Sequence, residues 1–182
     1  MPSVRAVKEV LKAAANCATI KYPYGPPAHL PEGFRGKLQI DPEKCVACGA
    51  CAMVCASGAM RRIEGDAKVG VKVEYPRCIF CGQCRDSCPT QAITLTTEFA
   101  LTSDRLDDLV LLNELEVAKC QICGKPIASK KQLEWGLRRV LDRINPVVKQ
   151  AVQQDAAKYL NLCIDCRRSN SLRLKIHTTK YV

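Results

Sequence analysis

The chain has 182 residues, of which 47% are hydrophobic, 25% charged and 5% aromatic, and its formal net charge is +10 at pH 7. This length and composition are typical of a folded protein with one ordinary domain or two small ones, and they exclude a large aromatic core. No apolar run approaches the roughly 18 residues of a membrane-spanning helix. Charges interrupt the N-terminal apolar stretch, which excludes a secretory signal peptide.

Residues 2–18 are predicted to form an amphipathic helix. Val4 and Leu11 recur on one side, while Lys8 occupies another face. Such a helix either lies at a membrane surface or against a membrane subunit, or packs on its own domain, and both interpretations stay open. The unpaired Cys17 is interpreted as a small buried hydrophobic residue.

Thirteen cysteines dominate the sequence. Two runs, at residues 45–55 and 78–88, have the spacing C-x2-C-x2-C-x3-C, which is typical of cubane iron–sulfur clusters in bacterial ferredoxins. Three thiolates of each run wrap one cluster, and the fourth begins a helix that points away and ligates the other cluster. The predicted ligands are Cys45, Cys48, Cys51 and Cys88 for one [4Fe–4S] cluster, and Cys55, Cys78, Cys81 and Cys84 for the second.

Disulfides and a pair of zinc sites are the rival interpretations of these eight cysteines. A chain without an export signal keeps its thiols reduced, which disfavours disulfides. Zinc knuckles rarely continue into a third and a fourth cysteine at this spacing. The two runs form an internal repeat with an offset of 33 residues, so that Gly49 corresponds to Gly82. These glycines are expected to let the backbone approach the clusters closely.

Strand patterns flank the repeat. The predicted strands cover residues 37–41, 69–75 and 92–96, and short helices are expected to begin after Cys51 and Cys84. The predicted fold is therefore α+β, a bacterial-type 2[4Fe–4S] ferredoxin unit with two hairpins and two short helices. Its metal centres replace much of the apolar core that so small a unit lacks.

The C-terminal third is predicted to be a helical extension. Ser129 and Gln132 form a capping-box pattern, and apolar residues follow at helical spacing up to Ile144. Asn145 and Pro146 are typical of an N-cap and the first position of a second helix. Two antiparallel helices would then bring together the cysteine pairs on either side of them.

Those two late pairs are predicted to form a third metal site. Its four ligands are Cys120, Cys123, Cys163 and Cys166. Each pair has zinc-knuckle spacing, and the set lacks the run that a cubane favours, so we expect one structural Zn²⁺ held by four thiolates. Mononuclear iron of the rubredoxin type and a third cubane remain the alternatives.

Several of these motifs carry a family resemblance. The segment CIFCGQCRDSCPTQAITLTTEF, preceded by FRGKLQIDPEKCVACGAC, resembles the iron–sulfur subunit I of respiratory complex I and its relatives in membrane-bound [NiFe] hydrogenases. TIKYPYGP at residues 19–26 and the acidic DRLDDL stretch support the likeness. The late cysteines resemble those of the ferredoxin-like subunit of formate hydrogenlyase, which favours the hydrogenase branch, with a complex I-type quinone oxidoreductase as the alternative.

The resemblance implies electron transfer rather than catalysis by this chain. We expect partners in a membrane-bound hydrogenase or complex I-like assembly, including the catalytic-side iron–sulfur subunit, and a peripheral place on the cytoplasmic face of the membrane. The predicted domains are a docking helix and lead-in (residues 1–36), a ferredoxin domain (37–100) and a C-terminal extension (101–182).

Two other functional classes account for less of the sequence. A freely diffusing ferredoxin leaves both terminal extensions unexplained. A nucleic-acid module would account for the basic tail at residues 167–182, but the sequence shows no nucleic-acid-binding motif, and bound metal thiolates would offset much of the basic excess.

Overall fold

The computed structural model describes residues 4–15, 22–25 and 29–171. The chain divides into two compact units, residues 1–34 and 35–182. Cys17 and most of the basic tail lie outside the described residues, so the predictions for them remain predictions. Among the described residues, no helix has both the length and the apolar character needed to cross a membrane.

The first unit contains helix α1 (Val4–Ala15), which lies within the predicted amphipathic segment. None of its side chains is buried, and the apolar Val4 and Leu11 are 75% and 63% exposed. On its charged side, Lys12 forms an ion pair of 3.5 Å with Glu9. The helix therefore carries an apolar side that it does not bury within its own unit.

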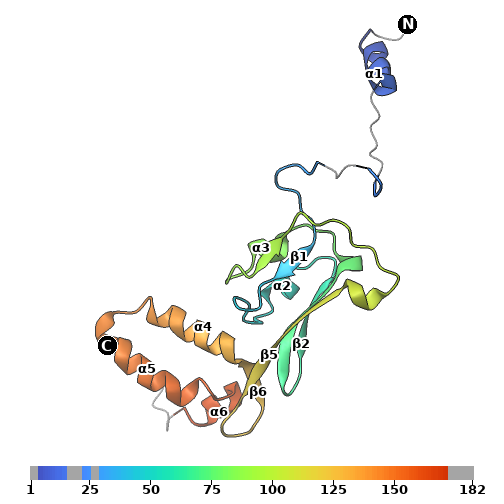
Figure 1. Ribbon diagram of the computed structural model, residues 1–182. Helices are drawn as coiled ribbons and strands as arrows, with labels where there is room; N and C mark the ends of the chain where they lie inside the picture. The colour runs from blue at the N-terminus through green and yellow to red at the C-terminus, as the bar shows by residue number, and fades with distance from the viewer. Residues whose placement is uncertain (1–3, 16–21, 26–28, 172–182) are drawn as a thin grey trace. The chain divides into compact units, whose positions relative to one another are not determined.

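The second unit begins with the repeated part of the sequence (Figure 1). Its elements in chain order are β1 (Leu38–Ile40), α2 (Ala50–Met53), β2 (Met60–Glu64), β3 (Lys68–Glu74), the 3-10 turn η1 (Tyr75–Arg77), α3 (Gln83–Asp86) and β4 (Ile93–Leu95). The predicted strands correspond to β1, β3 and β4, and each short helix begins one residue before the cysteine after which it is expected to begin. β1 and β4 form an antiparallel pair in which Leu38 lies opposite Leu95.

A second, four-stranded sheet has the order β2-β3-β5-β6 and connects the repeat to the extension. β5 (Val110–Lys119) follows the 3-10 turn η2 (Leu106–Leu109). It pairs antiparallel with β3, from Lys68 opposite Glu116 to Glu74 opposite Val110. β6 (Pro126–Ser129) pairs antiparallel with the C-terminal end of β5. Gly70 of β3 lies where β3 pairs with β5, and a side chain at this position would overlap the backbone oxygen of Asn113. A glycine is thus required for the two strands to approach each other.

This sheet links the predicted ferredoxin domain to the predicted C-terminal extension. The prediction divides the chain between residues 100 and 101, whereas the structure groups residues 35–182 as one unit because β5 pairs along β3. No strand is predicted from the sequence at the position of β5. Its period-two pattern, in which Asn113 and Leu115 are partly buried while Glu114 and Glu116 are exposed, is the signal that identifies it.

The main core lies between the two sheets and the short helices. It consists of Leu38, Cys51, Met60, Val71, Val73, Tyr75 and Ile93. The hydroxyl of Tyr75 is buried and donates a hydrogen bond of 2.5 Å to the backbone oxygen of Leu38, which joins the end of β3 to β1. Several of the predicted cluster cysteines pack against this core, so the loops that carry them rest on a fixed base.

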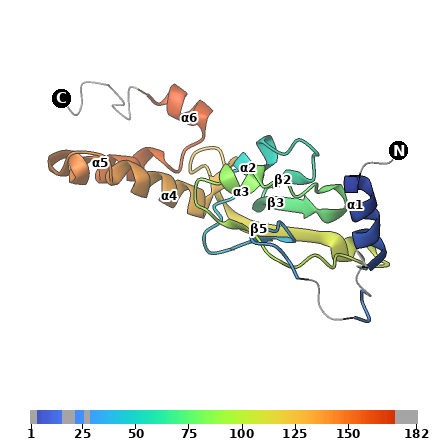
Figure 2. The same cartoon turned by 90° about the horizontal axis from the view of Figure 1, so that it is seen from above.

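Three helices complete the second unit: α4 (Lys130–Leu141), α5 (Pro146–Tyr159) and α6 (Ile164–Ser169). Both predicted caps are present, since Ser129 accepts from the Gln132 amide at 3.0 Å and Asn145 accepts from the Val147 amide at 3.0 Å. Figures 1 and 2 show α4 running away from the β6 end of the sheet and α5 returning beside it. This hairpin brings the late cysteine pairs together.

Candidate metal centres

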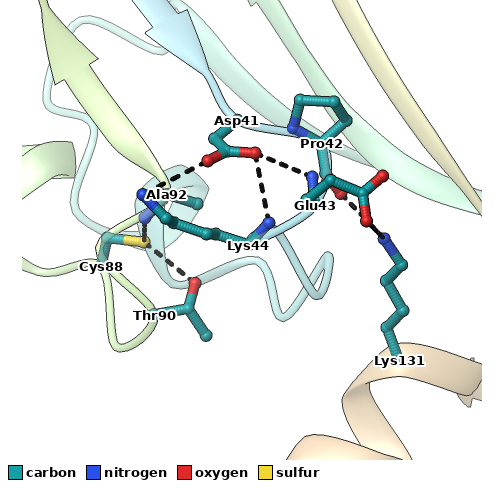
Figure 3. Close-up of polar contacts among 8 residues, drawn as sticks. All are labelled: Asp41, Pro42, Glu43, Lys44, Cys88, Thr90, Ala92 and Lys131. Carbon is teal, nitrogen blue, oxygen red and sulfur yellow. Dashed lines mark hydrogen bonds and ion pairs between the residues drawn. The ribbon is translucent and has the colours of Figure 1, made fainter.

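A tight turn positions the first cysteine run. The amide of Asp41 donates to the backbone oxygen of Ala92 at 2.8 Å, and the Asp41 carboxylate accepts from the Glu43 amide at 2.9 Å (Figure 3). The Glu43 amide lowers the pKa of Asp41 through this bond. The backbone oxygen of Asp41 then accepts from the Cys45 amide at 2.9 Å. The turn therefore fixes where the first predicted ligand leaves the sheet.

The eight predicted cluster ligands gather around two separate cavities. One cavity is lined by four cysteines from both runs, Cys45, Cys48, Cys51 and Cys88. The other is lined by Cys55, Cys78, Cys81 and Cys84. Each cavity thus receives three cysteines from one run and the fourth cysteine of the other, in the arrangement that the spacing predicts.

The backbone repeats its unusual conformations around the two cavities. Gly49 and Gly82, equivalent in the repeat, have φ values of 81° and 85° at the starts of α2 and α3. Ala47 and Phe80, also equivalent, have φ values of 53° and 52°. A left-handed conformation is costly for a residue with a side chain and persists where the surroundings enforce it. The left-handed conformation accounts for glycine at these two positions, and their close approach to the clusters stays a prediction.

Each fourth cysteine has a hydroxyl and a backbone amide beside its sulfur. Cys55 Sγ lies 3.6 Å from the hydroxyl of Ser57 and accepts from the Met60 amide at 3.4 Å. Cys88 Sγ lies 3.6 Å from the hydroxyl of Thr90 and accepts from the Ala92 amide at 3.3 Å (Figure 3). Neither hydroxyl is among the site residues predicted from the sequence, although each follows its cysteine by two residues.

Burial and hydrogen bonding act in opposite directions on the thiols. Burial raises the pKa of Cys51 to about 12 and that of Cys84 to about 11. Burial also acts to raise the pKa of Cys88, but the Thr90 hydroxyl and the Ala92 amide outweigh it and leave that pKa below its usual value. The hydrogen bonds at the fourth cysteine therefore favour its thiolate form, whereas burial of Cys51 and Cys84 favours the thiol until a metal displaces the proton.

The chemistry of the donor sets fits two [4Fe–4S] clusters. Neither cavity is lined by a histidine or a carboxylate, and each offers four sulfurs with apolar and small residues between them. Four cysteine thiolates are the ligand set of a [4Fe–4S] cluster, and an apolar surround limits access of water to it.

Two arginines contact equivalent points on the cysteine loops. Arg62 of β2 donates to the backbone oxygen of Cys48 at 3.4 Å, and Arg35 donates to that of Cys81 at 2.8 Å. Their guanidinium charges lie beside loops whose thiolates are negative when they bind metal. No repeat in the sequence signals these contacts, because Arg35 and Arg62 are not equivalent in the repeat.

The start of α4 holds the first cysteine loop. Ser129 is fully buried and donates from its hydroxyl to the backbone oxygen of Val46 at 2.6 Å. Lys131 donates to the backbone oxygen of Pro42 at 3.0 Å and forms an ion pair of 3.5 Å with Glu43 (Figure 3). The C-terminal extension is thus packed against the loop that begins the first run.

The four late cysteines form a third cluster of sulfurs. The possible ligand atoms of Cys120, Cys123, Cys163 and Cys166 lie within 4.8 Å of one another. The first pair sits in a turn after β5, in which Gly124 has a φ of 72°. Cys163 is the N-cap of α6, and its amide donates to Cys120 Sγ at 3.3 Å. The helical hairpin therefore brings the two pairs into one site, as predicted.

The late site also fits a metal ion. Four sulfurs around a tetrahedral Zn²⁺, each at about 2.3 Å, would lie roughly 3.8 Å apart, and the four sulfurs here all lie within 4.8 Å of one another. The amides of Cys123 and Cys163 donate to the Cys120 sulfur and lower the pKa of that thiol to about 6. The hydrogen-bonded neighbour Cys163 raises the pKa of Cys166 to about 12. The two amide donors thus favour the Cys120 thiolate, whose negative charge attracts a cation.

Comparisons with known proteins agree with this geometry. Residues 38–95 match the model of the 4Fe–4S dicluster domain. Formate hydrogenlyase subunit 6 of Escherichia coli (strain K12) is 33% identical over 134 residues, which cover 72% of each chain. NADH-quinone oxidoreductase subunit I of Salmonella choleraesuis (strain SC-B67) is 38% identical over 115 residues, or 57% of this chain and 63% of that subunit.

A solved membrane-bound sulfane sulfur reductase, an archaeal respiratory membrane complex, contains a chain that is 28% identical, with a TM-score of 0.43 and 60% coverage of both chains. The matched dicluster domain contains all eight cysteines of the two runs, and the formate hydrogenlyase relative aligns over most of the chain. The chain therefore belongs to the family of 4Fe–4S dicluster proteins that includes formate hydrogenlyase subunit 6 and NADH-quinone oxidoreductase subunit I, and it transfers electrons through its iron–sulfur clusters.

Proposed function

We propose that this chain relays electrons between two [4Fe–4S] clusters inside a membrane-bound hydrogenase-type complex. The observation that carries the proposal is the pair of cavities, each lined by three cysteines of one run and the fourth of the other. Crossed ligation ties the two clusters into one structural unit, in which α2 and α3 contact each other. A single polypeptide then holds both clusters at a fixed separation.

The chain's own residues hold and surround the clusters. When bound, the clusters supply one-electron oxidation and reduction. The cysteine thiolates ligate the irons, and the amides of Met60 and Ala92 donate to the sulfurs of the fourth cysteines. Arg35 and Arg62 place positive charge beside the two loops, and the apolar lining restricts water.

Crossed ligation is tested by replacing one fourth cysteine at a time. Cys88→Ser should damage the cluster held by Cys45, Cys48 and Cys51, whereas Cys55→Ser should damage the other. Low-temperature EPR of the reduced protein, together with iron counting, distinguishes the two variants. Wild-type protein reconstituted anaerobically with far fewer than about eight irons would refute the two-cubane assignment. Damage to the cluster of the variant's own run would refute the crossing.

The proposed complex is of the hydrogenase type because the formate hydrogenlyase relative aligns over 72% of this chain and subunit I over only 57%. The late metal site and its helical hairpin lie beyond the dicluster domain. A complex I-type quinone oxidoreductase is the second candidate, favoured by the 38% identity of subunit I. A free ferredoxin would leave the extension and the exposed face of α1 without a role.

We place the subunit on the cytoplasmic face of the membrane, held peripherally by its partners. The described helices include none that could span a membrane, and α1 offers an exposed apolar side for a membrane subunit or the membrane surface. Copurification of the tagged chain from its own cells tests the assembly. Recovery with hydrogenase subunits supports the hydrogenase branch, recovery with quinone-reductase subunits supports the alternative, and recovery of the chain alone contradicts both.

The late four-cysteine site is proposed to hold one structural Zn²⁺. Its sulfurs are spaced for a tetrahedral ion, and it lacks the third closely spaced cysteine with which a cubane run continues. Metal analysis of protein isolated from its own complex decides the identity. One zinc per chain supports the proposal. A single extra iron supports the rubredoxin-type alternative, and about four extra irons support a third cubane.

A further inference from the structure

A buried polar group on β5 has no partner among the described residues. Asn113 is partly buried, and its side-chain nitrogen Nδ2 is inaccessible to solvent and has no acceptor within hydrogen-bond distance. Buried donors are almost always satisfied, and an unpaired one destabilises the fold. An acceptor beside Asn113 would satisfy this donor.

The strand register indicates which acceptor that is. Asn113 lies directly opposite Val71 of β3, and Val71 lines the cavity of Cys45, Cys48, Cys51 and Cys88. Residues opposite each other in an antiparallel pair project from the same face of the sheet. Burial raises the pKa of Cys45, and the side-chain amide of Asn113 lies close enough to that thiol to act against the rise. The unpaired donor and the first cavity are thus neighbours.

We propose that the side-chain amide of Asn113 donates a hydrogen bond to a sulfur of the cluster in this first cavity, at Cys45 or at the adjacent cluster sulfide. The inference rests on the ligand assignment under the proposed function and adds a positioning residue from outside the dicluster domain. A donor of this kind stabilises the reduced cluster more than the oxidised one, because reduction adds negative charge at the sulfurs. Asn113 therefore raises the reduction potential of the first cluster.

The two hydroxyls provide an internal comparison. A ligating thiolate has no proton, so at Cys88 and Cys55 the hydroxyls of Thr90 and Ser57 are the donors. One hydroxyl lies 3.6 Å from a ligand of each cluster, so these two contacts are balanced between the clusters. Asn113 is an additional donor to the first cluster. The first cluster is therefore reduced more readily than its donors would allow without Asn113.

The test is an EPR-monitored redox titration of the full chain, reconstituted anaerobically and checked for about eight irons. Asn113→Leu keeps the approximate size and removes the donor. We expect the equilibrium constant for reducing the first cluster to fall about tenfold, which is about 59 mV for one electron, with the second cluster unchanged. Thr90→Val should lower the same midpoint, and Ser57→Ala should lower only the other, which assigns the two signals.

Unchanged midpoints in an Asn113→Leu protein that still holds its full iron would overturn the inference. If leucine prevents loading, Asn113→Val, which suits a strand, carries the same test and the same refuting outcome. The iron–sulfur stretching frequencies in resonance Raman spectra give a second readout, and they should shift when the hydrogen bond is lost. Failure of the ligand assignment is distinguishable, since the wild-type protein itself would then lack eight irons.

Discussion

The buried hydroxyl of Ser129 should stabilise the chain by more than an ordinary helix cap does. It accepts from the Gln132 amide at 3.0 Å and donates to the Val46 oxygen at 2.6 Å, and it is 0% exposed. Ser129→Ala removes the cap, at a cost of about 1 kcal/mol. It also leaves the buried Val46 carbonyl without its donor, which costs roughly 1–3 kcal/mol. The free energy of unfolding should therefore fall by about 2–4 kcal/mol.

The matched control is Asn145→Ala, because Asn145 caps α5 at an exposed position and contacts no cysteine loop. Anaerobic urea unfolding followed by circular dichroism should show a loss of about 1 kcal/mol for this variant. Chelator challenge should remove the first cluster faster from Ser129→Ala than from wild type, with the second cluster unaffected. Equal destabilisation by the two variants, or equal loss of both clusters, would refute the argument that α4 supports the first loop.

Three further predictions concern the sheet, the late metal site and α1. Gly70→Ala should destabilise the chain by about 1–3 kcal/mol, because its methyl group meets the backbone of β5. Gly136→Ala, at an open position of α4, should stabilise the chain by up to about 1 kcal/mol. Thermal unfolding tests both variants, and equal effects would contradict the close approach of β3 and β5. Cys163→Ser should release the late metal and lower the unfolding temperature while both cubane EPR signals remain, as metal analysis and calorimetry can show; retained metal would exclude Cys163 as a ligand. Deleting residues 2–18 should leave the EPR spectra intact but reduce recovery in the membrane fraction, and unchanged recovery would exclude a docking role for α1.

The parts of the site that follow from spacing could be predicted from the sequence. Cysteine runs determine which sulfurs share a cluster, since the fourth ligand cannot fold back onto its own cluster. Local capping rules likewise predict the starts of α4 and α5, because Ser129 and Asn145 act on amides two or three residues away. Each of these interactions depends on neighbours in the sequence.

The missed features depend on contacts between distant segments. The partner and register of β5 follow only from its pairing with β3, and the contact of Ser129 with Val46 spans 83 residues. Arg35 and Arg62 reach equivalent carbonyls from positions that the repeat does not relate. Such contacts leave no periodic trace, because they follow from packing that brings the segments together.

The pairing of β5 with β3 also fixes the distance along the sheet between the first cavity and the late metal site. From Asn113, beside the first cavity, to Cys120, in the late metal site, the chain runs almost entirely as extended strand, at about 3.4 Å per residue. A one-residue slip of β5 would turn Asn113 to the opposite face of the sheet and carry Cys120 away from Cys163 in the same movement. Insertions or deletions within this strand should therefore disturb both ends at once, whereas they should be tolerated in the turn between α4 and α5.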